Sequence, residues 1–160
     1  MTAVWLASAG ERDDVARLLR AFRDWLEADR PTERALIASV ERLLADPDTE
    51  YLLARTEDGL PPCGVCQLRY RHSVWTGAPD CWLEDLYVEE SGRHRGVGAA
   101  LVRAACERAR ARDARRIELD SNEDNAAAIA LYESLGFSAA SKAHGHLQGR
   151  DMLMGRPLDG

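Results

Sequence analysis

The sequence predicts an α/β fold, in which one domain holds a mixed β-sheet flanked by helices on both of its faces. Two observations support this prediction. Short apolar segments typical of strands are interspersed with longer segments whose apolar residues recur at helical spacing. In addition, residues 81–88, 93–98 and 99–111 read in order as a strand, a glycine-bearing turn and a helix. A chain of 160 residues with this order suits one layered domain over residues 1–160.

The first half of the chain should begin with a strand and two helices. Residues 3–7 form a short apolar segment, and Ser8 and Glu11 then have the spacing of a capping box at a helix start. Pro31 suits the first turn of the second helix, which should stop near Asp46. Both helices have apolar residues at helical spacing, namely Val15, Leu18, Leu19, Phe22, Trp25 and Leu26 in the first and Leu36, Ile37, Val40, Leu43 and Leu44 in the second.

Two strands are expected next, over residues 51–55 and 63–70, with a tight turn at Gly59 between them. A loop over residues 72–80 should then lead to the strand at 81–88, because this stretch contains a glycine and a proline.

The second half of the chain alternates between helices and strands. The helix over residues 99–111 should bury Leu101, Val102, Ala105 and Ala109. The order is completed by a strand over 116–120, a helix over 125–135 closed by Gly136, and a final pair of strands over 137–144 and 147–154.

The composition excludes several classes of partner. A net charge of −6 argues against nucleic acid, since phosphate binding requires a basic surface, and it suits a cationic substrate. No apolar run approaches the ~20 residues of a membrane span and no secretion signal is present, so we expect a cytoplasmic protein without a membrane partner. Its four cysteines should then form no disulfide framework.

Two motifs suggest a metal, but neither is complete. Cys63 and Cys66 fall in an expected strand and lack a second pair of ligands at suitable spacing. His144 and His146 have no acid or cysteine pattern to complete a site. We therefore expect no metal.

Two adjacent carboxylates, Glu84 and Asp85, interrupt the apolar strand over residues 81–88. A buried strand tolerates acids when they are paired, solvated or functional. Gly96 and Gly98 follow, where they allow backbone N–H groups to point toward one place at a helix N-terminus. Such a turn is typical of a site for an anion, usually a phosphate.

The glycines alone leave several interpretations of this turn open. A nucleoside-triphosphate loop needs a glycine followed by Lys and Ser or Thr, and the chain has no such string. A dinucleotide-binding turn matches at Gly96, Gly98 and Asp120, but Leu101 occupies the position of its third glycine. A turn with no ligand is the remaining alternative.

Two motifs resemble those of a known family. Arg93-x-x-Gly96-x-Gly98 resembles the acetyl-CoA pyrophosphate motif of the GNAT family of N-acetyltransferases. A second stretch, residues 122–137, resembles the family's other cofactor segment, with Asn122, Asn125, Ala128, Tyr132, Gly136 and Phe137 at the motif positions. The strand Leu83-Glu-Asp-Leu-Tyr-Val88 is similar to that of diamine acetyltransferases in particular. The resemblance covers essentially the whole chain.

This resemblance implies that acetyl-CoA is the cosubstrate. The backbone of Leu86, Tyr87 and Val88 would pair with the pantetheine arm, and Asn125 would also bind it. The arginine side chains at 93 and 95 would add charge beside the pyrophosphate. Its backbone ligands would be the N–H groups of Arg93, His94, Arg95, Gly96, Val97, Gly98 and Ala99.

The resemblance also implies two catalytic residues. Glu84 matches the base of diamine acetyltransferases, and Tyr132 matches the family's acid, which protonates the departing thiolate. The structural alternatives are an ion pair for Glu84 and packing at the core edge for Tyr132. Asp85 should face the other side of a regular strand, but a bulge would change this.

The expected activity is transfer of an acetyl group to a primary amine by direct attack, since no cysteine lies in an activated motif. The acceptor would lie between the first two helices and the loop over 72–80, near Asp24, Glu27 and Asp29. A polyamine, an amino acid, an aminoglycoside and a protein N-terminus or lysine are all open as acceptors, as is a homodimer. The main alternative is a non-catalytic acetyl-CoA-binding regulator, and a more remote one is a nicotinamide-dependent oxidoreductase.

Overall fold

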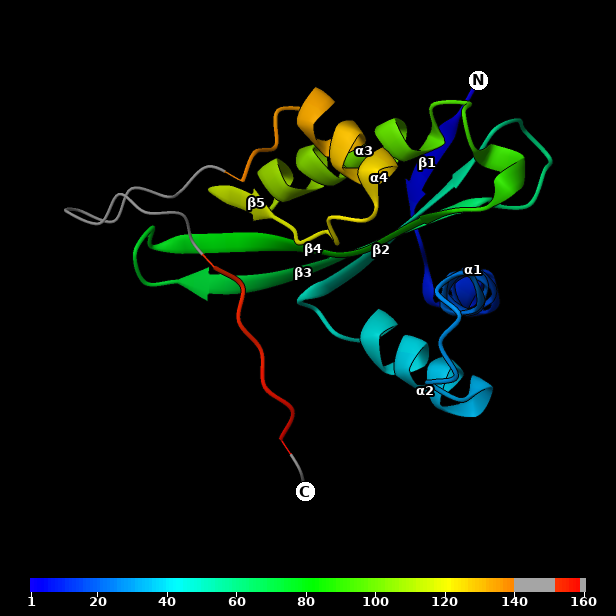
Figure 1. Ribbon diagram of the computed structural model, residues 1–160, viewed down its shortest axis with the longest axis horizontal. Coiled ribbons are helices and arrows are strands. Elements are labelled where there is room, and N and C mark those ends of the chain that lie inside the picture. The colour runs from blue at the N-terminus through cyan, green and yellow to red at the C-terminus, as the bar shows by residue number, and fades with distance from the viewer. Residues whose placement is uncertain (140–151, 159–160) are drawn as a thin grey trace. The chain divides into compact units, whose positions relative to one another are not determined.

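The computed structural model describes residues 1–139 and 152–158. The chain forms two compact units, Met1–Leu119 and Asp120–Gly160. The first unit holds a five-stranded sheet and three α-helices, and the second holds one α-helix among its described residues (Figure 1). The elements in chain order are β1 (Ala3–Leu6), η1 (Ala9–Glu11), α1 (Arg12–Trp25), α2 (Glu33–Leu44), β2 (Thr49–Arg55), β3 (Gly64–Ser73), β4 (Ala78–Val88), η2 (Glu90–Gly92), α3 (Val97–Ala111), β5 (Arg116–Glu118) and α4 (Ala126–Ser134).

The sheet is mixed, as the sequence predicts. Its strands lie in the order β1-β2-β3-β4-β5. The first four pair antiparallel, whereas β5 pairs parallel to β4. A parallel neighbour requires a crossover connection, and α3 supplies it.

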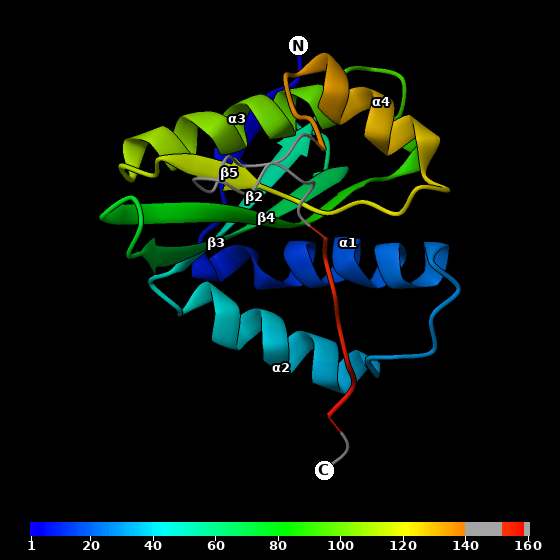
Figure 2. The ribbon, with the colours of Figure 1, turned by 60° about the vertical axis from the view of Figure 1, so that its left-hand side comes forward.

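Helices cover both faces of this sheet, with α1 and α2 on one side and α3 on the other (Figure 2). On the first face α1 and α2 bury apolar side chains against Tyr51, Leu53 and Val65. On the second face α3 buries the stripe that its spacing predicts: Leu101, Val102, Ala105 and Ala109. The predicted α/β class with helices on both faces is therefore confirmed.

The contact between α3 and β3 is close because Gly64 has no side chain. A methyl group at this position would lie 2.9 Å from side-chain carbons of both Leu101 and Val97. Val97 is the first residue of α3, and Gly64 pairs with Val88 at the end of β4. The N-terminus of α3 is thereby positioned beside the C-terminal end of β4.

A buried acid fastens the other end of α3 to the sheet. Glu50 on β2 accepts hydrogen bonds from Arg108 Nη2 at 2.6 Å and from the Tyr70 hydroxyl at 3.1 Å. Burial acts to raise the pKa of Glu50, but the hydrogen bond and charge of Arg108, together with the Tyr70 hydrogen bond and the charge of Arg112, outweigh it, so this pKa lies below its usual value. With both ends fixed, α3 is a rigid base for the turn that precedes it.

The predicted capping box is present at the start of η1, which leads directly into α1, whereas the start of α2 corrects a prediction. Glu11 and Ser8 form the capping box, with Glu11 Oε2 accepting from the backbone N–H of Ser8 at 2.8 Å. Thr32, however, caps α2 by accepting from the N–H of Ala35, so Pro31 precedes the cap instead of lying in the first turn. A threonine side chain satisfies one of the helix's unpaired N–H groups, which a proline cannot do.

The loop predicted over residues 72–80 is wrong. His72 pairs with Pro79 and Ser73 pairs with Ala78, so β3 and β4 form a hairpin whose connection is only residues 74–77. Pro79 suggested a loop, but a proline is tolerated near the end of a strand.

The described part of the second unit agrees with the predicted helix over residues 125–135. Asn125 caps α4 by accepting from the N–H of Ala128 at 3.2 Å, and Gly136 follows its end. The predicted final strands fall mostly on residues 140–151, which lie outside the described residues. Residues 137–139 and 152–158 form no helix or strand.

None of the helices in the described ranges is both long and apolar enough to cross a membrane.

Candidate active site

A β-bulge lies at the two acids of β4. Leu68 pairs with Leu83 and Gln67 pairs with Asp85, so Glu84 is an extra residue without a partner in the register between β3 and β4. The Glu84 side chain is exposed, and that of Asp85 is half-buried. Bulges are frequent beside active sites, because they redirect a side chain and end regular pairing.

The acids lie near a buried phenol on the face that α1 and α2 cover. Tyr51 pairs with Gln67, which pairs with Asp85, so these three residues form one row across the sheet. Burial raises the pKa of Tyr51, Asp85 raises it further, Arg69 opposes, and Glu84 adds a smaller increase. Both carboxylates therefore act on one buried site, and the Tyr51 phenol stays protonated at neutral pH.

One edge of β4 is open beyond the bulge. On the β5 side, Asp80, Cys81 and Trp82 pair with β5. No strand within the described residues pairs with the range Leu86 to Val88 on that side. An open edge presents backbone N–H and C=O groups to any extended ligand.

The glycine turn over residues 93–96 and the first turn of α3 follow, and we call them the anion cradle. Their backbone is typical of an anion site. His94 and Gly96 have φ of 58° and 76°, and α3 begins directly after them. Alternation of left-handed and ordinary conformations turns successive N–H groups toward one point. A side chain on Gly96 would be strained at this φ, although a methyl group there would meet no atom within 4 Å.

The donors available to an anion lie in the first turn of α3. Ala100 donates to Gly96 O at 3.0 Å, which closes the first helical hydrogen bond. The three residues before Ala100 are Val97, Gly98 and Ala99. In the part of the chain that the structure describes, no backbone carbonyl accepts a hydrogen bond from their N–H groups. The Arg93 N–H donates to Glu90 O at 3.2 Å, so it is not one of these donors.

The Arg93 side chain lies in a group of aromatic rings that the sequence did not reveal. Its Nε donates to Val88 O at 3.0 Å. Its guanidinium carbon lies 5.7 Å from the ring centroid of Trp25 and 5.9 Å from that of Tyr87. Phe22 stacks on both rings, with centroids 6.1 Å from Trp25 and 5.3 Å from Tyr87. Phe22 and Trp25 already had helical spacing, but nothing in the sequence indicated that Arg93 and Tyr87 meet them.

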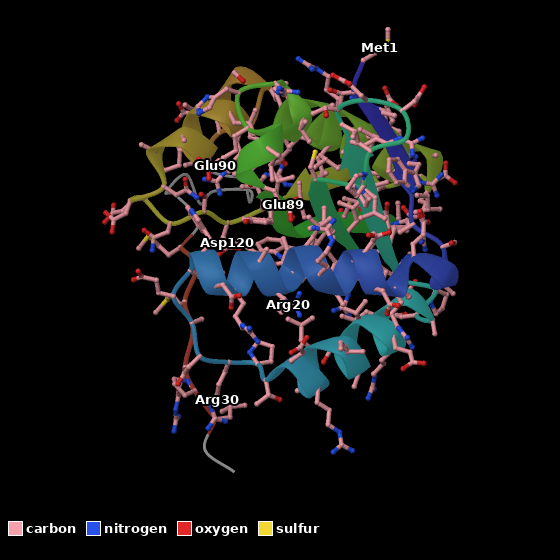
Figure 3. The ribbon with its side chains drawn as sticks, turned by 90° about the vertical axis from the view of Figure 1, so that its right-hand side faces the viewer. Met1, Arg20, Arg30, Glu89, Glu90 and Asp120 are labelled. Atoms are coloured by element: carbon pink, nitrogen blue, oxygen red, sulfur yellow. The ribbon has the colours of Figure 1, made fainter. Side chains whose placement is uncertain are left out.

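A second arginine joins α1 to the end of β4. Arg17 donates to Glu89 Oε1 and to Pro62 O. Figure 3 shows Glu89 beside α1. The helix is thus tied to the residue that directly follows β4.

The remaining predicted site residues lie in α4, at the N-terminus of α4, and around the end of α1. Tyr132 is buried in the second unit, where its ring centroid is 6.0 Å from that of Phe137. The Asn125 cap uses the side-chain carbonyl and not the amide NH₂. Glu27 and Asp29 are exposed in the connection between α1 and α2, and Asp24 in the last turn of α1 accepts from Arg23 at 2.8 Å.

The residues described show no metal centre: no three His, Cys, Asp or Glu side chains among them are grouped to hold an ion. Cys63 and Cys66 are free and buried, and burial raises the pKa of both thiols. The pair at His144 and His146 lies outside the described residues.

Comparison with known proteins identifies the family. The model of the acetyltransferase (GNAT) family matches residues 14–137. Thialysine N-epsilon-acetyltransferase of Sus scrofa is 28% identical over 156 residues, covering 91% of this chain and 90% of that protein. Aminoglycoside N(6')-acetyltransferase type 1 of Stenotrophomonas maltophilia is 30% identical over 121 residues, covering 74% of this chain and 75% of that protein.

Solved structures agree with these relatives. A proposed acetyltransferase from Arthrobacter sp. FB24 superposes with a TM-score of 0.83 at 28% identity, covering 98% of this chain and 96% of its own. An aminoglycoside N-acetyltransferase in complex with CoA has the same fold, with a TM-score of 0.74 at 20% identity and coverage of 92% and 94%. The chain therefore belongs to the acetyltransferase (GNAT) family, and it is an N-acetyltransferase that depends on acetyl-CoA.

Proposed function

We propose that this protein acetylates a small cationic primary amine, which attacks the acetyl-CoA thioester directly while Glu84 accepts its proton. The observation that carries the proposal is the sequence of features along β4. A bulge exposes Glu84, the open edge from Leu86 to Val88 follows it, and the anion cradle at the start of α3 comes next. The acid, the open strand edge and the anion cradle follow one another along the chain. The acetyl group, the pantetheine arm and the pyrophosphate follow one another in the same order in acetyl-CoA.

The chain's own groups fit the cosubstrate. The backbone of Leu86, Tyr87 and Val88 would pair with the amides of the pantetheine arm. The N–H groups of Val97, Gly98 and Ala99 would hold the pyrophosphate, with the helix dipole and the exposed Arg95 adding positive charge. His94 and Gly96 shape the turn that allows this approach.

The reaction needs a base because an ammonium has no lone pair with which to attack. Glu84 would take a proton from the bound ammonium, directly or through water, and the free amine would attack the thioester carbonyl. The C–S bond then breaks as the carbonyl re-forms, and the thiolate takes a proton from Tyr132. The second proton that the nitrogen loses on becoming an amide passes through water to the Tyr132 phenolate, and Glu84 releases its proton to solvent. A phenol of pKa ~10 is a suitable acid toward a thiolate of similar basicity. Asp85 is the next candidate for the base, since it lies beside Glu84 at the bulge.

The role of Glu84 predicts a particular pH profile. Glu84→Gln should lower kcat/KM most at low pH, where almost all of the amine is protonated, and the deficit should narrow as pH rises. The measurement is kcat/KM from pH 6 to 10, with Glu107→Gln as the control, because Glu107 is an exposed acid on α3. A loss of kcat/KM of the same size at every pH would show that Glu84 is a structural acid, and Asp85 would then be the candidate base.

The acceptor is proposed to carry a second positive charge. Asp24, Glu27 and Asp29 lie at the end of α1 and in the connection to α2, and Glu27 and Asp29 are exposed. Carboxylates near an ammonium also oppose its deprotonation, so the acids that attract the acceptor should be separate from the base. Relatives named for thialysine and for aminoglycosides also act on amines.

This acceptor class predicts a preference that salt weakens. Diamines should outperform monoamines of equal length chiefly through a lower KM, and the advantage should shrink as ionic strength rises. The measurement is KM for matched amine pairs at low and high salt. Equal KM values at low salt would show that the distal acidic site does not exist.

A further inference from the structure

We propose that Arg93, the first residue of the pyrophosphate motif, is a positioning residue for the acceptor side of the enzyme and not a ligand of the pyrophosphate. Its side chain would hold α1 and its exposed Trp25 against the end of β4. This inference rests on the proposed function, because it assigns the acceptor to the side of the sheet that α1 covers.

The contacts of the Arg93 side chain lie on α1 and β4. Nε donates to Val88 O, the last residue of β4. The guanidinium plane lies within cation–π distance of the Trp25 and Tyr87 rings, at 5.7 and 5.9 Å. Trp25 belongs to α1 and Tyr87 to β4, so one side chain joins a helix, a strand and the turn from which it extends.

The aromatic rings that Arg93 contacts form a wall next to the site. Phe22 stacks between Trp25 and Tyr87, which makes the three rings continuous. Trp25 is nevertheless 48% exposed at the end of α1, so it is not fully covered by the packing of α1. Tyr87 stands two residues after Asp85 on the same sheet face, so the wall begins beside the acids.

A second side chain also joins α1 to the end of β4. Arg17 on α1 binds Glu89 Oε1, directly after the end of β4, and Pro62 O, in the connection between β2 and β3. The segment that leads from Glu84 to the cradle therefore contacts α1 at two places. Glu89 binds Arg17, and Arg93 contacts Trp25. Loss of Arg93 should therefore release Trp25 and loosen the acceptor wall, while Arg95 and the N–H groups of α3 still hold the phosphates.

Two acetyl donors separate this role from phosphate binding. Acetyl-pantetheine has the thioester and arm of acetyl-CoA but no pyrophosphate. Arg93→Ala should raise the KM of the amine about tenfold with either donor, because the acceptor wall is disturbed in both cases. The control Arg95→Ala should raise the KM of acetyl-CoA alone. If the effect of Arg93→Ala is confined to acetyl-CoA and absent with acetyl-pantetheine, Arg93 is a phosphate ligand and the proposal is overturned.

The lysine variant gives a second discrimination. Lysine keeps the positive charge but lacks both the planar guanidinium and the Nε donor. Arg93→Lys should therefore raise the amine KM as Arg93→Ala does. Recovery of wild-type KM values in Arg93→Lys would show that charge alone matters, which contradicts the proposal.

A double-mutant cycle tests the contact without any turnover. Arg93→Ala, Trp25→Ala and the double variant should be compared in urea unfolding. The two changes should be coupled by about fivefold in the unfolding equilibrium constant, as expected for a cation–π contact. Strictly additive effects would overturn the proposal. If the wild-type protein acetylates no amine, the proposed function fails, whereas this cycle still decides whether Arg93 holds Trp25.

Discussion

Gly98→Val is expected to weaken acetyl-CoA binding at least 100-fold, or about 3 kcal/mol, while the fold is retained. Gly98 lies in the first turn of α3, and its N–H is one of the three donors proposed for the pyrophosphate. An isopropyl group among these donors would keep the phosphate oxygens beyond hydrogen-bonding distance. The measurement is calorimetric titration with acetyl-CoA, together with the urea midpoint of each variant.

The control for this variant is Arg103→Val, which places the same residue at an exposed position of the same helix. It should bind acetyl-CoA as the wild type does. Gly98 is a cleaner position than Gly96, because Gly96 has φ of 76° and any side chain there strains the backbone itself. Normal affinity in Gly98→Val would show that this turn is not the cradle.

Tyr132→Phe is expected to lower kcat about 100-fold or more with little change in the affinity for acetyl-CoA. The variant keeps the ring that packs near Phe137 and removes the hydroxyl that is proposed to protonate the leaving thiolate. The measurements are kcat with a saturating amine and the Kd of acetyl-CoA. An unchanged kcat would reduce Tyr132 to a packing residue, and a loss of only a few-fold would show that water replaces the phenol.

The helices were predictable because their signals are local. The buried stripe of α3 follows from spacing within one segment, and the capping box at Ser8 and Glu11 involves residues three apart. Residue types alone also indicated the glycine turn, since the left-handed backbone at Gly96 is typical of glycine.

The hairpin and the bulge were less accessible because strand register is not local. Residues 72–80 contain a glycine and a proline, which favour a loop, but pairing between β3 and β4 outweighs these preferences. The sequence left both a regular strand and a bulge open at the two adjacent acids, and only the pairing of β4 with β3 shows that Glu84 is the extra residue. The sequence shows that the two acids are neighbours, but it does not show which of them pairs with a residue of β3.

The side-chain contacts of Arg93 could not be predicted at all. The motif suggested a phosphate ligand, and the Trp25 ring belongs to a helix far away in the chain. Only the packing of α1 against β4 brings Trp25, Phe22 and Tyr87 to the same place. A sequence motif therefore located the turn correctly, but it gave no information about the direction of its first side chain.

The most direct test of the central claim is amine-dependent release of the CoA thiol. The protein is incubated with acetyl-CoA and a panel of amines that includes diamines, amino acids, aminoglycosides and a peptide with a free N-terminus. Free thiol and the mass of the acetylated amine are measured together. The account predicts that thiol appears only when an amine is present, in equal amount to an N-acetylated product, and that Glu84→Gln slows both at pH 7. Tight binding of acetyl-CoA without thiol release from any amine would contradict it and would identify a non-catalytic acetyl-CoA-binding protein.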